Sequence, residues 1–112
     1  MLFNIFKKRE KQYIDLNAET FNKGIKSKDT VIIDVRSAGE FSSGKIKNAR
    51  NINMMSTEFV EQIKSLPKDK VYYLYCRSGS RSGSAASFMA KQGFENIYNL
   101  KGGLMSWPYE TY

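Results

Sequence analysis

The sequence predicts an α/β domain built on a mostly parallel sheet. Five short runs of apolar, β-branched and aromatic residues alternate with segments whose apolar residues recur at helical spacing. The chain has 112 residues and shows neither an internal repeat nor a Pro/Gly-rich linker, which suits one domain with a single hydrophobic core. We therefore treat residues 12–112 as one domain and residues 1–11 as an N-terminal extension.

The first strand and helix are predicted at the beginning of this domain. Residues 13–16, YIDL, are a short strand candidate. Asn17 has a side chain suited to an N-cap, and Ala18, Phe21 and Ile25 follow at helical spacing. A helix is therefore expected directly after Asn17.

The second strand is predicted over residues 31–35, VIIDV. This β-branched run is typical of strands buried on both faces of a parallel sheet. Ser37 and Glu40 have the spacing of a capping box, in which each side chain accepts a hydrogen bond from the other residue's backbone N–H. A short helix is therefore expected to begin after Ser37 and to end at Gly44.

The middle of the chain gives a weaker strand and a clearer helix. Residues 49–54, ARNINM, are predicted to form the strand. Ser56 is expected to cap a helix in which Phe59 and Ile63 share one face and which Pro67 ends.

The last third of the chain contains the clearest strand. Residues 70–75, KVYYLY, lead directly into Cys76, the only cysteine of the chain. A helix is predicted over residues 82–92, with Gly93 at the position where a left-handed backbone ends many helices. Residues 96–100, NIYNL, form the final strand candidate. Because ligands of parallel sheets bind beyond the carboxyl ends of the strands, Cys76 lies where a site is expected.

The absence of histidine limits the chemistry. A Cys–His pair, a Ser–His–Asp triad and a His-ligated metal site are all impossible in such a chain, and one thiolate alone makes no zinc or iron–sulfur site. We therefore expect no metal ion, and the chemistry implied by the resemblance described below requires no organic cofactor either. A single cysteine cannot form an internal disulfide either, so we expect a free thiol in the reducing cytoplasm.

The formal charge of +7 suits an anionic partner. The Lys and Arg residues are scattered and form no basic stripe with interleaved aromatic residues, so no nucleic acid is expected. Residues 1–11 place a short apolar patch before their basic residues, the reverse of a secretory signal, and the patch is far shorter than the roughly 20 residues that span a bilayer. We expect no transmembrane segment, and at most a weak contact of residues 1–11 with a membrane surface.

The loop after Cys76 is the candidate site. A free cysteine has a pKa near ~8.5 and needs help to react at neutral pH, and here that help cannot come from histidine. A helix N-terminus, inward-facing loop N–H groups and guanidinium charge each stabilise a thiolate. The sequence offers all three in an anion-binding loop that consists of Arg77, Ser78, Gly79, Ser80, Arg81 and Ser82, with Ser82 expected to start the helix.

A structural role is the alternative for this cysteine. A lone cysteine at the end of a strand is commonly a small buried hydrophobic residue. The arginines and small residues that follow Cys76 would be poor neighbours in an apolar pocket, so the sequence favours a functional thiol.

Four ordered motifs resemble the single-domain rhodaneses, a family of thiosulfate sulfurtransferases. The motifs are IIDVRSAGEFSSGKI (32–46), ARNIN (49–53), CRSGSRS (76–82) and GF…IYNLKGGLMSW (93–107). Two positions depart from the family pattern: Lys45 stands where histidine is usual, and Asn53 where proline is frequent.

The resemblance implies a rhodanese-like fold with a five-stranded sheet flanked by helices on both faces. It also implies that Cys76 carries sulfur as a persulfide. Sulfur would pass from thiosulfate or a similar small anionic donor to cyanide in vitro, to cellular thiols, or to a protein acceptor. Asp34, Arg36 and Glu40 match an element of the family that mainly ties the structure together.

Two other functions remain open. A Cys-dependent phosphatase or arsenate reductase has a related loop with five residues between Cys and Arg, whereas only residues 77–80 separate Cys76 from Arg81. The shorter loop suits one added sulfur better than a tetrahedral oxyanion. A persulfide carrier or binding module that acts with a protein partner is the third candidate.

Overall fold

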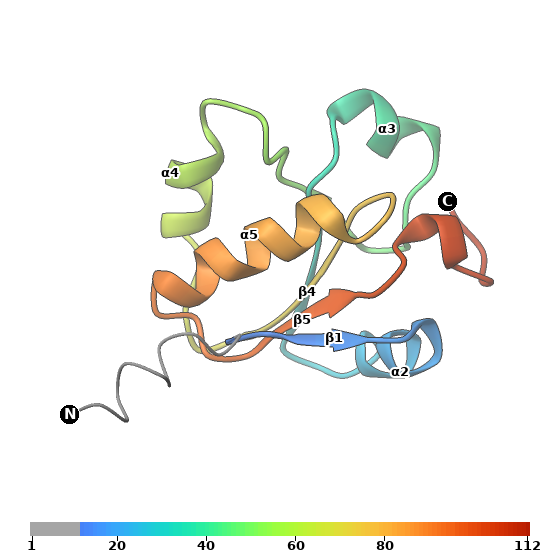
Figure 1. The fold of residues 1–112 in the computed structure, drawn as a ribbon, viewed down its shortest axis with the longest axis horizontal. Helices are drawn as coiled ribbons and strands as arrows, with labels where there is room; N and C mark the ends of the chain where they lie inside the picture. The colour runs from blue at the N-terminus through green and yellow to red at the C-terminus, as the bar shows by residue number, and fades with distance from the viewer. Residues whose placement is uncertain (1–11) are drawn as a thin grey trace.

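The computed structural model describes residues 12–112 (Figure 1). Its sheet has the strand order β1-β5-β4-β2-β3, and every neighbouring pair is parallel. The strands are β1 (Ile14–Leu16), β2 (Thr30–Asp34), β3 (Arg50–Asn51), β4 (Val71–Tyr75) and β5 (Ile97–Leu100). The predicted α/β fold with a five-stranded parallel sheet is confirmed.

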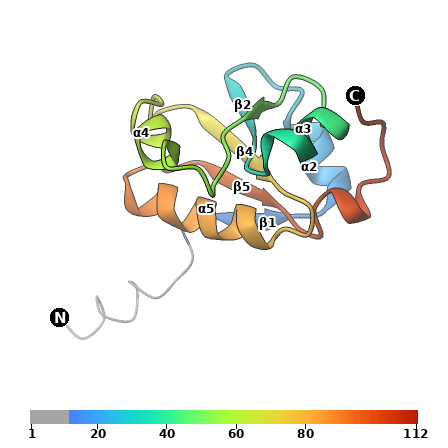
Figure 2. The same cartoon turned by 90° about the horizontal axis from the view of Figure 1, so that it is seen from above.

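Helices follow the strands and cover both faces of the sheet. They are α2 (Ala18–Gly24), α3 (Ala38–Ser43), α4 (Phe59–Lys64), α5 (Ser80–Lys91) and the 3-10 helix η1 (Leu104–Ser106). The helices α4 and α5 lie on one face, α2 lies on the other, and α3 lies near the carboxyl ends of the strands (Figures 1 and 2).

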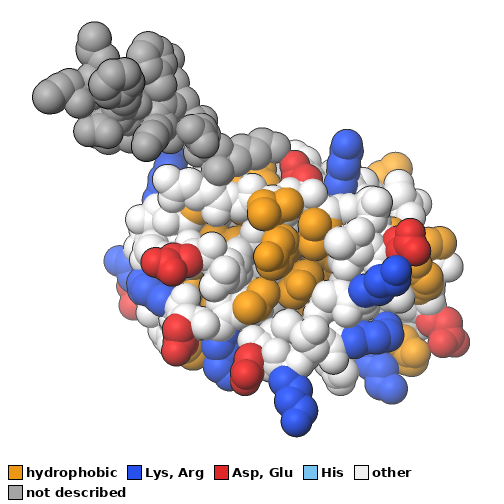
Figure 3. Space-filling view, turned by 90° about the horizontal axis from the view of Figure 1, so that it is seen from below, with side chains coloured by type: hydrophobic (Ala, Val, Ile, Leu, Met, Phe, Trp, Pro, Cys, Tyr) orange, Lys and Arg blue, Asp and Glu red, His pale blue; other side chains and the backbone are white. Residues whose placement is uncertain are grey.

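Side chains of the central strand β4 alternate between two cores. Tyr72 and Leu74 belong to the core beneath α4 and α5, whereas Tyr73 and Tyr75 belong to the core beneath α2. Cys76 continues the alternation on the α4 and α5 side. The short helix α2 covers only part of its face, and Figure 3 shows hydrophobic side chains at the surface on this side of the molecule.

Several predicted helix boundaries are confirmed. The side chain of Asn17 caps α2 by accepting a backbone N–H at 2.9 Å. Ser37 and Glu40 form the capping box of α3, whose C-cap is Gly44. Gly93, with φ of +99°, follows the C-cap of α5.

The region before α4 differs from the prediction. The strand expected over residues 49–54 contains only two paired residues. Ser56 does not cap α4, because Glu58 occupies the N-cap position. Ser56 instead closes a turn that precedes the helix, in which its carbonyl accepts the Phe59 N–H at 3.2 Å.

No helix within residues 12–112 combines the length and apolar character needed to cross a bilayer. The membrane contact expected of residues 1–11 lies outside the described part of the chain.

Candidate active site

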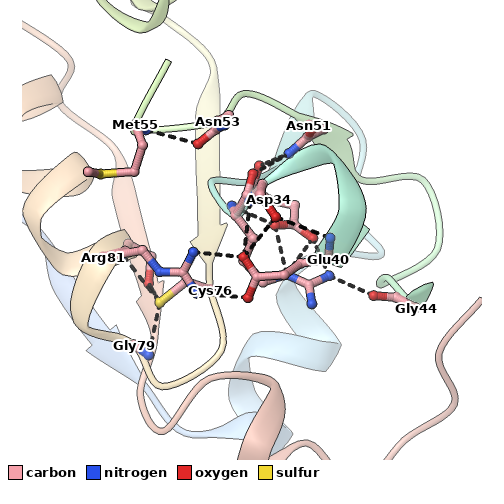
Figure 4. Close-up of polar contacts among 12 residues, drawn as sticks. Asp34, Glu40, Gly44, Asn51, Asn53, Met55, Cys76, Gly79 and Arg81 are labelled. Atoms are coloured by element: carbon pink, nitrogen blue, oxygen red, sulfur yellow. Dashed lines mark hydrogen bonds and ion pairs between the residues drawn. The ribbon is translucent and has the colours of Figure 1, made fainter. Parts of the chain in front are cut away.

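The candidate site lies where β4 passes into α5 (Figure 4). Cys76 is the first residue after β4, and Gly79 is the N-cap of α5. Gly79 adopts φ of +96°, a left-handed conformation that glycine reaches without steric cost, and its carbonyl accepts the Gly83 N–H at 3.0 Å. The helix therefore begins at Ser80, and the prediction that Ser82 starts it is wrong.

Three hydrogen-bond donors surround the sulfur of Cys76. The Gly79 N–H lies 3.1 Å from Sγ, and the N–H and the hydroxyl of Ser82 each lie 3.4 Å from it. The Cys76 side chain is fully buried, with 0% of its surface exposed. Ser82 is thus a direct partner of the sulfur from the first turn of α5.

These donors lower the pKa of the Cys76 thiol. Burial is the largest single effect and raises the pKa, because it removes water from the thiolate. The hydroxyl and N–H of Ser82 and the N–H groups of Ser78 and Gly79 act in the opposite direction, and together they outweigh burial. The thiol is therefore easier to ionise than an ordinary cysteine, without a histidine beside it.

The two loop arginines differ in their contacts. Arg81 binds Glu40 through two parallel hydrogen bonds of 2.9 and 3.0 Å, so its guanidinium is already paired with a carboxylate. The hydrogen bond from Arg81 is the largest effect on Glu40, and that from the Ser37 N–H is the second; together they lower the pKa of Glu40 to about 2. Arg77 is exposed, and its guanidinium has no hydrogen bond or ion pair to another described residue. Arg77 is thus the loop cation that remains available to a ligand.

Asp34 and Arg36 form a buried anchor near the site. The Arg36 guanidinium donates to both carboxylate oxygens of Asp34, with a closest distance of 2.6 Å, and to the Gly44 carbonyl. The Asn51 amide donates to the carbonyls of both Asp34 and Arg36. Neither member of this ion pair is hydrogen-bonded to Cys76 Sγ, and the pair links the end of β2 to Gly44 at the end of α3.

The segment after β5 supports the loop from behind, a contact that the sequence reasoning missed. The Leu104 N–H donates to the carbonyl of Cys76 at 3.0 Å. A Cβ at Gly103 would overlap the Arg77 carbonyl oxygen, so only glycine allows the two backbones to approach this closely. The consecutive glycines were visible in the sequence, but nothing local indicated what they approach.

Two hollows border the loop. One, of about 460 Å³, lies between α3, Arg77 and η1, and the other, of about 430 Å³, adjoins residues 78–80 and the ends of β1 and β5. The larger hollow of about 1090 Å³ lies between α2 and the C-terminal segment and includes no residue of the Cys76 loop. Within residues 12–112, no three His, Cys, Asp or Glu side chains are grouped to hold a metal ion.

The fold and the loop define an α/β protein in which a buried cysteine, directly after the central strand of a parallel sheet, is surrounded by hydrogen-bond donors. Comparison with known proteins gives the family: a model described as Rhodanese-like domain matches residues 17–110. The chain belongs to the rhodanese-like domain family.

Individual relatives agree with this assignment. YqhL of Bacillus subtilis is 40% identical over 92 residues, which cover 82% of this chain and 70% of that protein. A protein of Allochromatium vinosum named sulfurtransferase is 32% identical, with 72% of this chain and 74% of that protein covered. The crystal structure of a rhodanese-related protein from Thermoplasma volcanium has a TM-score of 0.77 at 32% identity, covering 89% of this chain and 98% of that one.

Other relatives are much longer than this chain. They include proteins named tRNA uridine(34) hydroxylase, and the chain spans 33% of the one from Pelagibacter ubique at 33% identity. The likeness to these proteins therefore concerns about a third of their length.

Proposed function

We propose that this protein transfers sulfane sulfur from thiosulfate or a similar anionic donor to a thiophilic acceptor through a persulfide on Cys76. The observation that carries the proposal is the set of three hydrogen-bond donors around Cys76 Sγ, which favours the thiolate in a chain that has no histidine. The family membership and the relative named sulfurtransferase support the same chemistry.

The reaction has two steps. In the first, the Cys76 thiolate attacks the outer sulfur of thiosulfate; the sulfur–sulfur bond of thiosulfate breaks, sulfite leaves with its two negative charges, and an anionic persulfide remains. In the second, cyanide or a cellular thiolate attacks the terminal sulfur of the persulfide, and the Cys76 thiolate is restored. Each step conserves charge and needs no oxidant, reductant or metal.

The anion-binding residues have separate tasks in this proposal. Gly79 and Ser82 donate to the reacting sulfur, and Arg77 attracts the donor and the departing sulfite from the exposed side of the loop. Because Cys76 has no exposed surface at rest, the donor must displace part of the loop to reach the sulfur. Arg81 links α3 to the loop through its ion pair with Glu40, and its charge also interacts favourably with the Cys76 thiolate.

Phosphate-ester or arsenate chemistry is less well supported. A related phosphatase loop would need a guanidinium free to bind a tetrahedral oxyanion. Arg81, the arginine in the comparable position, already places both terminal nitrogens on Glu40. A persulfide carrier acting with a protein partner uses the same first step, and it differs only in passing sulfur slowly to small acceptors.

Sulfur loading is the direct test. The protein is incubated with thiosulfate at neutral pH and its intact mass is measured; a gain of one sulfur atom is expected, with none in Cys76→Ser. Cyanide should discharge the loaded protein as thiocyanate. Fast loading with negligible discharge by small acceptors would indicate the carrier, whereas hydrolysis of an aryl phosphate without sulfur uptake would overturn the proposal.

A further inference from the structure

Asn99 is a buried polar residue of β5 that lies behind the Cys76 loop. Its side chain is 3% exposed, although the face of β5 on which it lies is otherwise apolar. The amide nitrogen Nδ2 donates to the Asp15 carboxylate on β1 at 2.9 Å and to the Gly79 carbonyl in the loop at 3.2 Å. One side chain therefore links the edge strand of the sheet to the loop that holds Cys76.

The orientation of this amide follows from its partners. Both groups near Nδ2 are hydrogen-bond acceptors, so a flipped amide would set Oδ1 against two oxygen atoms. In the observed orientation Oδ1 is buried and has no hydrogen-bond partner among residues 12–112. Leaving a buried acceptor unpaired costs free energy, so this orientation is kept because of the two hydrogen bonds that Nδ2 donates.

Gly79 is the residue whose geometry this contact controls. Its N–H lies 3.1 Å from Cys76 Sγ, while its carbonyl accepts from both Asn99 and the Gly83 N–H. A glycine in a left-handed conformation has wide freedom in both backbone dihedral angles. A second anchor on its carbonyl restricts that freedom and so restricts where its N–H points.

We propose that Asn99 is a positioning residue, which acts through Gly79 to keep a backbone N–H directed at the sulfur of Cys76. This role rests on the proposed sulfur transfer, because an N–H group directed at the sulfur stabilises both the attacking thiolate and the persulfide. Asn99 itself is hydrogen-bonded to Gly79 and Asp15 and not to the sulfur of Cys76. The Asp15 carboxylate accepts the second hydrogen bond of the same amide nitrogen and so helps to hold the amide in place.

The test compares Asn99→Ala with Asn51→Ala. Asn51 is a matched control, because its amide also donates to two backbone carbonyls, but on the Asp34 and Arg36 side of the site. The rate of Cys76 alkylation by iodoacetamide is followed by intact mass across a range of pH. In Asn99→Ala, alkylation should be about threefold to tenfold slower at low pH, the factor expected when one hydrogen bond to a charged sulfur is weakened, and should reach the wild-type plateau at high pH.

The pH profile separates positioning from general loosening. A merely loosened loop would expose the sulfur and speed alkylation at every pH. A second variant, Asn99→Leu, fills the space of the amide without its donors, and it should show the same change in profile if Asn99→Ala fails to fold. Superimposable wild-type and variant profiles, or an equal change in Asn51→Ala, would overturn the proposal. Alkylation needs no sulfur donor, so a wild-type protein that takes up no sulfur would count against the proposed function alone.

Discussion

The sharpest single test of the sulfur environment is Ser82→Ala. This substitution removes the hydroxyl that donates to Cys76 Sγ but keeps the Ser82 backbone N–H, which donates at the same distance of 3.4 Å. Alanine is also the best helix former, and the position lies inside α5, so the helix itself should persist. The expected result is a thiol with a higher pKa in a protein that remains folded.

The size of the effect follows from the contact that is lost. A hydrogen bond to an ionised group contributes about 1.5–3 kcal/mol, and the long distance here favours the lower end. A change of about 1.4 kcal/mol alters an ionisation constant tenfold. The thiolate fraction at pH values below the pKa should therefore fall about tenfold, and the rates of alkylation and of sulfur loading should fall with it.

The assay is iodoacetamide alkylation at several pH values, read by intact mass. Ser84→Ala is the matched control, because Ser84 is an exposed serine of the same helix and makes no contact with the sulfur. Loop opening, which the buried thiol requires for reaction, is common to all three proteins and cancels in the comparison. If Ser82→Ala and Ser84→Ala give the wild-type pH profile, the hydroxyl does not stabilise the thiolate and the reasoning fails.

Three further predictions concern the surroundings of the loop. Glu40→Gln should lower the free energy of unfolding at neutral pH by about 1 kcal/mol, since the ion pair with Arg81 is partly exposed. Folding depresses the pKa of Glu40 from 4.5 to about 2. The difference in free energy of unfolding between wild type and variant, measured in urea, should therefore be complete above pH 4.5 and disappear as the pH falls through about 2. A difference that persists in acid would contradict this. Gly103→Ala should lower Tm because the added Cβ would overlap the Arg77 carbonyl oxygen. Gly39→Ala, with open space around its Cβ in α3, should stabilise by up to about 1 kcal/mol. Equal Tm values for the two variants would refute the steric argument. Arg77→Ala should leave Tm unchanged and slow loading from thiosulfate severalfold, and unchanged loading would remove Arg77 from the proposed site.

Local patterns predicted those parts of the fold that depend on local interactions. The capping box of Ser37 and Glu40 involves residues only three positions apart. The end of α5 at Gly93 depends on the left-handed conformation of that one residue. The start of α5 was missed by two residues: Ser82, expected to start the helix, lies in its first turn and faces the sulfur, and the left-handed Gly79 is the N-cap. Gly79 could be recognised as small, but its conformation depends on the backbone it packs against.

The candidate site was only partly predictable for the same reason. Cys76 and its following loop are contiguous in sequence, so a reactive thiol in an anion-binding loop could be proposed from these residues, while the persulfide was implied by the family resemblance. The pairing of Arg81 with Glu40 joins residues 41 positions apart, and the link from Asn99 to Asp15 joins residues 84 positions apart. Such contacts depend on the order of strands in the sheet, which places β5 between β1 and β4 and thus puts Asn99 beside the loop.

A site without histidine is suited to a reaction that moves no proton in its central steps. A general base has to take up and release a proton, and its benefit is greatest when the nucleophile is neutral before attack. Here the hydrogen-bond donors around Cys76 favour the thiolate before thiosulfate arrives, and the persulfide of the proposed reaction is an anion as well. The N–H of Gly79 and the hydroxyl of Ser82 can therefore serve the thiolate and the persulfide in turn without changing their own protonation. In the proposed reaction fixed neutral donors stabilise both anions, and the loop that carries them is held by the Asn99 side chain of β5 and the Leu104 N–H of η1. The cysteine at the end of β4 lies where these donors converge.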